Sequence, residues 1–464
     1  MRTILLLISC MVSTFLVSQH ITGTWNGALE VLPGNQLSIV FHVMEEGDGY
    51  VTTMDSPDQG ALGIPTDSTS YVDGRLIVTI NSIQAKYEGQ WSATQDSLIG
   101  TFSQGPASFP LVLTRDAPVV EKIVRPQDPV DFPYTQEEVS FINPKGGHTL
   151  AGTLTIPRSG EFSVVEILIT GSGPQNRDSE LLNHRPFLVL SDYLTRGGVA
   201  TLRYDDRGVA DSGGDHGTAT SADFADDVAA AVSYLRSRPD MADKKIGLAG
   251  HSEGGIIAPM VAAENSEVDH IILLAGPGID ISELLILQGK KLSTADGASQ
   301  ESIEANTRIQ KLLFGFLKDN PNLKGEEYKS QLKEKLEEAY EFMPEESQAQ
   351  SGGKEEFMKG QGGVLMGDWF RFFLCHDPQA TLAKVDCPIL AVNGSLDLQV
   401  TSEENLAGIK EATAHNDQVT IKEFPKLNHL FQTAVTGSFS EYATIEETFN
   451  EEVMSYVLEW IGKL

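Results

Sequence analysis

The sequence has few cysteines and few basic residues. Three cysteines occur in 464 residues, and 34 Lys and Arg stand against 65 Asp and Glu, which gives a net charge of −31. A negative net charge of this size repels phosphate backbones and anionic lipid surfaces, so we expect no nucleic-acid partner. So few cysteines form no disulfide scaffold. Cys375 and Cys387 could pair in an oxidising compartment, but we expect two buried thiols.

Sequence motifs for metals and nucleotides are missing as well. The chain contains no CxxC, HExxH, EF-hand loop, Walker loop or GxGxxG. These are the commonest sequence-readable sites for metals and nucleotides, so we predict neither a metal nor an organic cofactor. The composition, with 41% hydrophobic and 21% charged residues, is ordinary for a globular protein. The length predicts at least two domains.

Long apolar runs are also missing, apart from one at the N-terminus, where Arg2 precedes residues 4–17. This run is too short to span a membrane, and with the small residue Ser18 at its end it is typical of a secretory signal peptide. We therefore predict a signal peptide over residues 1–18, a secreted or periplasmic protein and no transmembrane segment. Residues 7–10 loosely resemble a lipoprotein cleavage box, and lipidation at Cys10 is the less favoured alternative.

Short alternating runs separated by turn residues follow the signal segment. They are typical of β-hairpins and span residues 24–31, 36–43, 75–80, 85–91, 98–102 and 108–113. We predict a small antiparallel β-barrel-like domain over residues 19–117. Its opening Gly23-Thr24-Trp25-Asn26-Gly27 resembles the first strand of a lipocalin-type barrel. Of two interpretations, we favour a β domain that packs beside a catalytic domain over a barrel that carries a ligand.

The rest of the chain alternates strands with helices. Residues 118–136 contain four prolines and are predicted to be a linker. Residues 137–464 are predicted to form an α/β domain with a mostly parallel sheet. Its expected strands are 138–142, 149–156, 164–170, 199–204, 245–248, 271–275, 389–392 and 418–424. Helices are expected at 223–236, behind Ser221 as N-cap, and at 445–461. The helical insertion at about 281–382 is predicted to form a cap.

A serine stands at the end of one expected strand. Gly250-His251-Ser252-Glu253-Gly254 follows the strand 245–248 and precedes an apolar helical stretch. Small residues around Ser252 permit a cramped strand-to-helix turn that exposes its hydroxyl above the sheet. This context favours a nucleophile over an ordinary glycine-rich turn.

A serine nucleophile needs a base that is oriented by a third group. Asp397 follows the strand 389–392 and His429 follows the strand 418–424, so both belong at the sheet edge that carries Ser252. His251, His376 and His415 are less suitable bases, because a sharp turn aims His251 elsewhere, His376 ends a cap helix and His415 precedes its strand.

Acyl transfer also needs hydrogen-bond donors for the oxyanion. The amide of Glu253, at the start of the helix after the nucleophile, is one candidate. The second is the amide of Gly173 in the small-residue loop after strand 164–170, with Ser172 as the neighbouring alternative.

Taken together, these motifs resemble the α/β-hydrolases of the secreted bacterial esterase and serine aminopeptidase-like group. The resemblance covers residues 137–464 and rests on Gly171-Ser172-Gly173-Pro174, Arg203-Tyr204-Asp205-Asp206-Arg207-Gly208 with Asp211-Ser212, Gly250-His251-Ser252-Glu253-Gly254, Gly394-Ser395-Leu396-Asp397 and Asn428-His429. It implies Ser252 as nucleophile, His429 as base and Asp397 as its orienting acid. It also implies an oxyanion hole formed by the amides of Gly173 and Glu253.

Two further features bear on the substrate. Arg207 could clamp a substrate carboxylate, but we favour an internal ion pair. Met366, Trp369, Phe370 and Phe373 recur at helical spacing in the cap, where they form an apolar face. That face is either core packing or a wall for an acyl chain, and we assign these four residues as substrate-binding.

The sequence thus predicts a carboxylesterase-type serine hydrolase that cleaves small-molecule esters with short acyl chains, roughly C2 to C8. One alternative is a serine aminopeptidase on short peptides, which would have to bind the substrate ammonium with carboxylates. The other is a binding protein on a hydrolase fold without catalysis.

Overall fold

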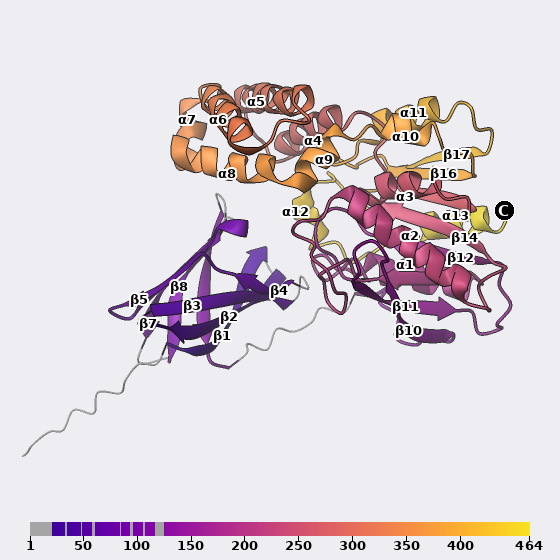
Figure 1. Ribbon diagram of the computed structural model, residues 1–464, viewed down its shortest axis with the longest axis horizontal. Coiled ribbons are helices and arrows are strands. Elements are labelled where there is room, and N and C mark those ends of the chain that lie inside the picture. The colour runs from indigo at the N-terminus through magenta and orange to yellow at the C-terminus, as the bar shows by residue number, and fades with distance from the viewer. Residues whose placement is uncertain are drawn as a thin grey trace, which may run out of the picture.

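The computed structural model describes residues 21–464 apart from 33–34, 48, 58–60, 84, 93–95, 105–106 and 117–124. The predicted signal peptide, residues 1–18, lies outside the described residues. Figure 1 shows an N-terminal β domain beside a larger domain of strands and helices, with a layer of helices extending over both.

The N-terminal domain is a closed antiparallel barrel. Eight strands follow one another in the order β2-β1-β9-β8-β7-β6-β5-β3, and the pairing of β3 with β2 closes the ring, while β4 pairs with β3 at its edge. Its described strands are β1 (Gly23–Leu32), β2 (Asn35–Glu46), β3 (Gly49–Ser56), β4 (Ala61–Pro65), β5 (Ser68–Val72), β6 (Arg75–Ile80), β7 (Ala85–Ser92), β8 (Ser97–Gln104) and β9 (Ala107–Thr114). The sequence analysis missed β3, β4 and β5.

Alternation of apolar and polar residues forms the barrel, because successive side chains of a strand point to opposite faces. In β6, Leu76, Val78 and Ile80 are fully buried, while the residues between them are more exposed. Asp73 and Gly74 turn β5 into β6 with φ values of 52° and 78°, as a tight hairpin turn requires.

The second domain is built on a mixed eight-stranded sheet in the order β10-β11-β13-β12-β14-β15-β16-β17. The pairs β10–β11 and β11–β13 are antiparallel and all the others are parallel. The strands are β10 (Thr135–Ile142), β11 (Thr149–Ile156), β12 (Val164–Ile169), β13 (Ala200–Tyr204), β14 (Lys245–His251), β15 (His270–Leu274), β16 (Ile389–Gly394) and β17 (Val419–Phe424).

Helices cover both faces of this sheet. One face packs on α1 (Pro186–Arg196) and α13 (Glu451–Ile461), and the other on α2 (Ser221–Ser237), α3 (Gly254–Ala262), α10 (Pro378–Leu382) and α11 (Ser402–Ala412). Burial on both faces explains why these strands read as continuous apolar runs. The N-cap of α2 is Thr220, in a capping box with Asp223, so the prediction of Ser221 as N-cap was wrong by one residue.

A helical layer is inserted between β15 and β16. It has its own apolar core and consists of α4 (Ile281–Ala295), α5 (Gln300–Asp319), α6 (Gly325–Tyr340), α7 (Glu345–Gln350), α8 (Lys354–Met366) and α9 (Asp368–Cys375). In Figure 1 this cap forms the orange layer above the sheet and the barrel. A short helix, α12 (Phe439–Tyr442), lies near its underside.

The described part of the proline-rich segment is docked on the second domain. Arg125 donates hydrogen bonds to the backbone carbonyls of Leu182, Ala443 and Ile445 at 2.9–3.0 Å. This part of the predicted linker, which includes a turn closed by the amide of Asp128 and the carbonyl of Arg125, is thus held on the second domain by side-chain contacts.

The two remaining cysteines are unpaired. Cys387 is partly buried, but Cys375 is exposed at the end of α9, so the expectation of two buried thiols was wrong for Cys375. Among the helices that the structure describes, none combines the length and apolar character needed to cross a bilayer.

Candidate active site

Ser252 lies on a sharp turn between β14 and α3. Its φ of 55° is in the left-handed region, which is unusual for a serine and typical of a strained nucleophile turn. The Ser252 amide donates to the carbonyl of Leu274 in β15 at 2.9 Å. A Cβ atom at Gly250 would lie 2.0 Å from the Gly254 carbonyl oxygen, and one at Gly254 would lie 2.4 Å from that of Ile169. The turn therefore requires both glycines.

Asp397 and His429 form a buried pair beside this turn. His429 Nδ1 and Asp397 Oδ2 are 2.8 Å apart, and the two residues are 4% and 3% exposed. The other carboxylate oxygen of Asp397 accepts hydrogen bonds from the amides of Gln399 and Val400 at 2.8 and 2.9 Å. Because Nδ1 of His429 faces this carboxylate, we assign the ring proton to Nδ1, which donates to Asp397. Nε2 of His429 is then free to accept a proton.

The loops that carry the acid and the base are fastened to each other. The amide of Leu396 donates to the carbonyl of Leu427 at 2.9 Å, and the amide of Lys426 donates to Ser395 Oγ at 2.9 Å. The distance between Asp397 and His429 is thus fixed by backbone contacts as well as by their own hydrogen bond.

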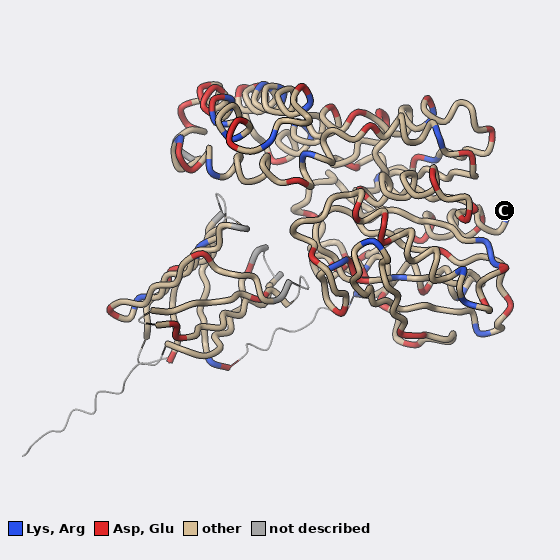
Figure 2. The backbone as a smooth tube through the Cα atoms, in the orientation of Figure 1, with Lys and Arg blue, Asp and Glu red and all other residues tan. Residues whose placement is uncertain are grey.

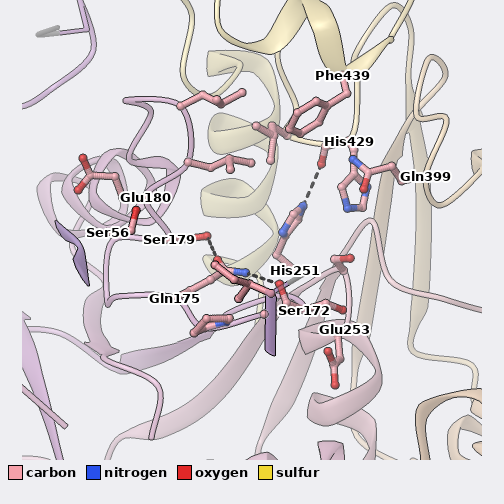
Figure 3. A pocket seen from close by; sticks show the side chains of 18 of the residues that line it. Ser56, Ser172, Gln175, Ser179, Glu180, His251, Glu253, Gln399, His429 and Phe439 are labelled. Carbon is pink, nitrogen blue, oxygen red and sulfur yellow. Dashed lines mark hydrogen bonds between the residues drawn. The ribbon is translucent and has the colours of Figure 1, made fainter. Parts of the chain in front are cut away.

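His251 is a residue whose part in the site the sequence analysis missed. The sharp turn was expected to aim it elsewhere, yet its ring lies 4.7 Å from the ring of His429, and its Nε2 lies 2.9 Å from the His429 carbonyl oxygen (Figure 3). Removal from water and the neighbouring His429 lower the pKa of His251 to about 3. A neutral His251 can donate to that carbonyl without repelling a protonated His429. Its position directly before the nucleophile was the available signal.

The small-residue loop after β12 lies on the same side of the sheet. Gly173, with a φ of 89°, and Ser172 both line the cavity that contains Ser252. Gln175 holds this loop: its side-chain amide donates to the Ser172 carbonyl at 3.2 Å, and its side-chain oxygen accepts from Ser179 at 2.5 Å (Figure 3). The loop therefore has a fixed shape beside the serine.

Two adjacent acids after β13 anchor this loop from below. Asp206 accepts from Thr170 Oγ1 at 2.6 Å and from the Gln175 amide at 2.9 Å, and Asp205 accepts from the amide and side chain of Arg177. Burial and the nearby carboxylate of Glu253 raise the pKa of Asp206 to about 8, against the effect of these hydrogen bonds. Neither acid was identified as an anchor from the sequence.

The neighbouring Arg207 does not reach the cavity. It is buried, and its Nε donates to Asp227 Oδ2 in α2 at 2.6 Å. This is the internal ion pair favoured by the sequence analysis, so Arg207 is not available to clamp a substrate.

Glu253 links the turn to the cap through its side chain. Its carboxylate is buried, and Oε1 accepts from Ser221 Oγ at 2.5 Å and from Trp369 Nε1 in α9 at 2.9 Å. The sequence analysis considered only the Glu253 amide, which lies directly after Ser252 at the N-cap of α3. The carboxylate adds a rigid connection between the serine turn and the cap wall.

Three of the four predicted cap residues face the cavity. Trp369, Phe370 and Phe373 line it, and the rings of Trp369 and Phe373 stack 5.3 Å apart. Met366 does not line it and is 46% exposed, so its assignment as substrate-binding was wrong. The helix is interrupted at Gly367, where ψ is 132°, and α8 ends at Met366. The spacing that placed Met366 on the same face does not continue across this break.

Ser252, His251 and His429 line one cavity of about 890 Å³ together with the loop 171–175. The cap contributes one wall. Residues 179–183 and mostly apolar residues of the barrel line much of the remainder. The volume is typical of a pocket for a small organic ligand.

The comparison with family models gives a match to "Serine aminopeptidase, S33" over residues 186–322. This stretch runs from α1 through the serine turn into the cap, and the sheet around it has the strand order described above. The second domain therefore has the α/β-hydrolase fold.

A curated relative of this chain is esterase EstD from Thermotoga maritima, which is 26% identical over 315 residues. The match covers 68% of this chain and 66% of the relative, so slightly less than two thirds of EstD is represented. The family match and this relative confirm the predicted resemblance to the esterase and serine aminopeptidase-like group.

Solved structures similar to the hydrolase include a Pyrococcus furiosus esterase, Pf2001, with 17% identity and a TM-score of 0.44. That match covers 74% of this chain and 96% of the esterase. Est1E from Butyrivibrio proteoclasticus, solved with ferulic acid, has 18% identity and a TM-score of 0.40, covering 70% of this chain and 99% of Est1E.

Proposed function

We propose that the protein is a serine hydrolase that cleaves carboxylic esters with short acyl chains through an acyl-enzyme. The observation that carries this proposal is the convergence of three strand ends on one cavity. Ser252 follows β14, Asp397 follows β16 and His429 follows β17, with His429 Nδ1 bound to Asp397 at 2.8 Å. This convergence supports Ser252 as the nucleophile, His429 as its base and Asp397 as the orienting acid.

In the first half of the reaction, His429 Nε2 accepts the proton of the Ser252 hydroxyl as its oxygen attacks the ester carbonyl. The resulting oxyanion is stabilised by the amides of Gly173 and Glu253. His429 then gives its proton to the departing alcohol, which leaves the acyl group on Ser252. Asp397 stabilises the imidazolium and keeps its ring in the required orientation.

In the second half, His429 accepts a proton from a water molecule, which attacks the acyl carbonyl. The same two amides stabilise the second oxyanion, and the proton returns to Ser252 as the acid departs. Because His251 is neutral, it adds no positive charge beside the His429 imidazolium in either half.

The cap favours esters over peptides. Its wall toward the cavity is aromatic and aliphatic, whereas Glu326, Glu327, Glu345 and Glu346 are exposed and do not line the cavity. Figure 2 shows acidic segments, in red, gathered at the end of the cap that lies away from the sheet. An aminopeptidase must pair the free ammonium of its substrate with a carboxylate, because burying an unpaired cation is costly. Two carboxylates line the cavity, those of Glu180 and Glu253, and neither belongs to the cap wall. One oxygen of Glu253, Oε1, accepts from Ser221 and Trp369.

The test compares kcat/KM on p-nitrophenyl butyrate with kcat/KM on alanyl- and prolyl-arylamides in one preparation. We expect butyrate hydrolysis and little or no arylamide hydrolysis. Arylamide turnover equal to or above that on butyrate would overturn the proposal in favour of the aminopeptidase alternative. No turnover of either, with no labelling by a fluorophosphonate, would favour the binding protein without catalysis.

A further inference from the structure

The cavity around Ser252 continues into the barrel. Its lining includes side chains from five strands of the ring, β1, β2, β3, β8 and β9, and from the edge strand β4. They include Leu29, Leu37, Ile39, Met54, Phe102 and Phe109. The barrel therefore contributes an apolar compartment to the catalytic cavity, in addition to packing beside the catalytic domain.

The two ends of the barrel differ in their packing. Toward the start of β1, the interior is filled by Trp25, Phe41, Leu111 and Leu113, all of which are almost completely buried. The Arg115 guanidinium lies 3.7 Å from the Trp25 ring centroid. An eight-stranded barrel is wide enough either to be filled by side chains or to hold one small ligand. This barrel is filled at one end, and its other end borders the cavity.

Along single strands, the inward-facing residues show where the packed core of the barrel ends and the cavity begins. In β2, Phe41 and Val43 belong to the buried core and do not line the cavity, whereas Leu37, on the same face of the strand, lines the cavity outside that core. Ile39 lies between them, belongs to the buried core and also lines the cavity. In β9, Leu111 and Leu113 belong to the filled end and Phe109 lines the cavity. One continuous apolar face thus passes from packed core to cavity wall.

The barrel part of the cavity lining carries no charge among the described residues. Its polar members are Ser56 and Gln104, and the others are aliphatic or aromatic. Figure 3 shows Ser56 on the side of the cavity that also holds Glu180, opposite Gln399. A wall of this composition favours an uncharged hydrocarbon and disfavours a peptide backbone or an ammonium group, which would lose hydrogen bonds to water there.

We infer that the open end of the barrel binds the long aliphatic chain of an ester whose carbonyl lies at Ser252. This inference rests on the proposed ester hydrolysis and extends its substrate class beyond C8. The short-chain limit assumed one apolar wall, formed by the cap, whereas the cavity has a second wall in the barrel. The chain enters from the serine and ends against the filled half of the barrel.

The aliphatic chain can belong to either side of the ester. p-Nitrophenyl dodecanoate carries it on the acyl side, and dodecyl acetate carries it on the alcohol side. Both are compared with p-nitrophenyl butyrate, which is short on the acyl side. If a change in the barrel lowers kcat/KM for only one of the two long esters, the barrel binds the side of the ester that carries the chain in that substrate.

The variant that tests the inference is Leu37→Glu, which places a charge in the cavity at a position outside the buried core of the barrel. The matched control is Val112→Glu in β9, because Val112 is 46% exposed on the outer face of the same barrel. A second test variant is Ile64→Glu in the edge strand β4, which also lines the cavity and pairs only with β3.

We expect Leu37→Glu and Ile64→Glu to lower kcat/KM for one long ester by about tenfold or more, because each methylene group removed from water contributes to binding. Their kcat/KM for butyrate should fall far less than their kcat/KM for that long ester, and Val112→Glu should change kcat/KM for neither substrate. Far-ultraviolet circular dichroism verifies that each variant is folded.

Unchanged kcat/KM on both long esters in a folded Leu37→Glu or Ile64→Glu variant would overturn the inference and leave the proposed function intact. A wild-type protein that hydrolyses butyrate and neither long ester would do the same. Absence of butyrate hydrolysis in the wild-type protein would instead contradict the proposed function itself. Loss of butyrate and long-ester hydrolysis to the same degree in a folded variant would also contradict a chain-binding role.

Discussion

The α/β domain and the barrel line the same cavity with different kinds of side chain. The α/β domain contributes groups whose positions are fixed by hydrogen bonds, such as Asp397 with three acceptor contacts and Ser252 on a strained turn. The barrel contributes apolar side chains, some of which, such as Ile39 and Phe102, also belong to its own buried core. The reactive groups of the cavity therefore come from the α/β domain, whereas the apolar surface of the cavity comes from both domains.

The largest expected effect concerns the serine and the base. Ser252→Ala and His429→Ala should each lower kcat by at least about 10⁴-fold on butyrate, and the double variant should lose little more, because residues that act as a unit are not additive. Steady-state rates with p-nitrophenyl butyrate measure this. Near-wild-type turnover by His429→Ala would show that another group is the base.

The Asp397→Asn variant tests how the α/β domain orients His429. An amide at this position can present its NH₂ group to His429 Nδ1, which would favour the wrong imidazole tautomer, and kcat should fall by about 10⁴-fold. The fold should persist, because the side-chain oxygen can still accept from the amides of Gln399 and Val400. A kcat within tenfold of wild type would contradict the orienting role of Asp397.

Removal of the barrel tests the comparison directly. The docked residues Arg125 and Gln127 hydrogen-bond to the α/β domain, so the shortened chain should begin at Arg125. We expect kcat/KM on butyrate within about threefold of the full chain and a loss of about tenfold or more on the long ester that the barrel binds. A folded, monodisperse shortened chain that is inactive on butyrate would show that the barrel completes the catalytic site.

The predicted residues of the catalytic site depended on local motifs and on strand order. Ser252, Asp397 and His429 each follow an apolar run, and the ends of parallel strands meet at one sheet edge, so their convergence could be expected without a structure. The contacts of His251, Asp206 and the Glu253 carboxylate could not be predicted from the sequence. They depend on the angles at which loops leave the sheet, which no periodicity in the sequence encodes.

The barrel was harder to predict. Strands β3 to β5 are short or rich in Thr and Ser, and β5 (STSYV) is half exposed, so their alternation is weak. The cavity could not be predicted at all, because Leu37 and Phe41 look alike in the sequence and differ only in which end of the barrel they occupy. The prediction that Met366 shares a helix face with the cavity wall was wrong for a related reason. It extended helical spacing across the break at Gly367.

The smallest expected effect concerns His251 and acid stability. Its pKa is lowered to about 3 from an ordinary value near 6.5, so the unfolded chain binds a proton that the folded chain excludes between these values. His251 thus contributes stability that is present above about pH 6.5 and is lost as the pH falls toward 3. His251→Gln, which keeps an amide donor for the His429 carbonyl, should lose less unfolding free energy than wild type between pH 6.5 and 4. Urea titrations across that range measure it, and parallel curves for the two proteins would contradict the lowered pKa.

The central claim is that Ser252 is the nucleophile, activated by His429. The most direct measurement is the stoichiometry and site of labelling by a fluorophosphonate, read by peptide mass spectrometry on the full chain. The account predicts one phosphonate per chain on the peptide that contains Ser252, none in Ser252→Ala and strongly slowed labelling in His429→Ala. Labelling of a different residue, or equal labelling of the Ser252→Ala variant, would contradict it.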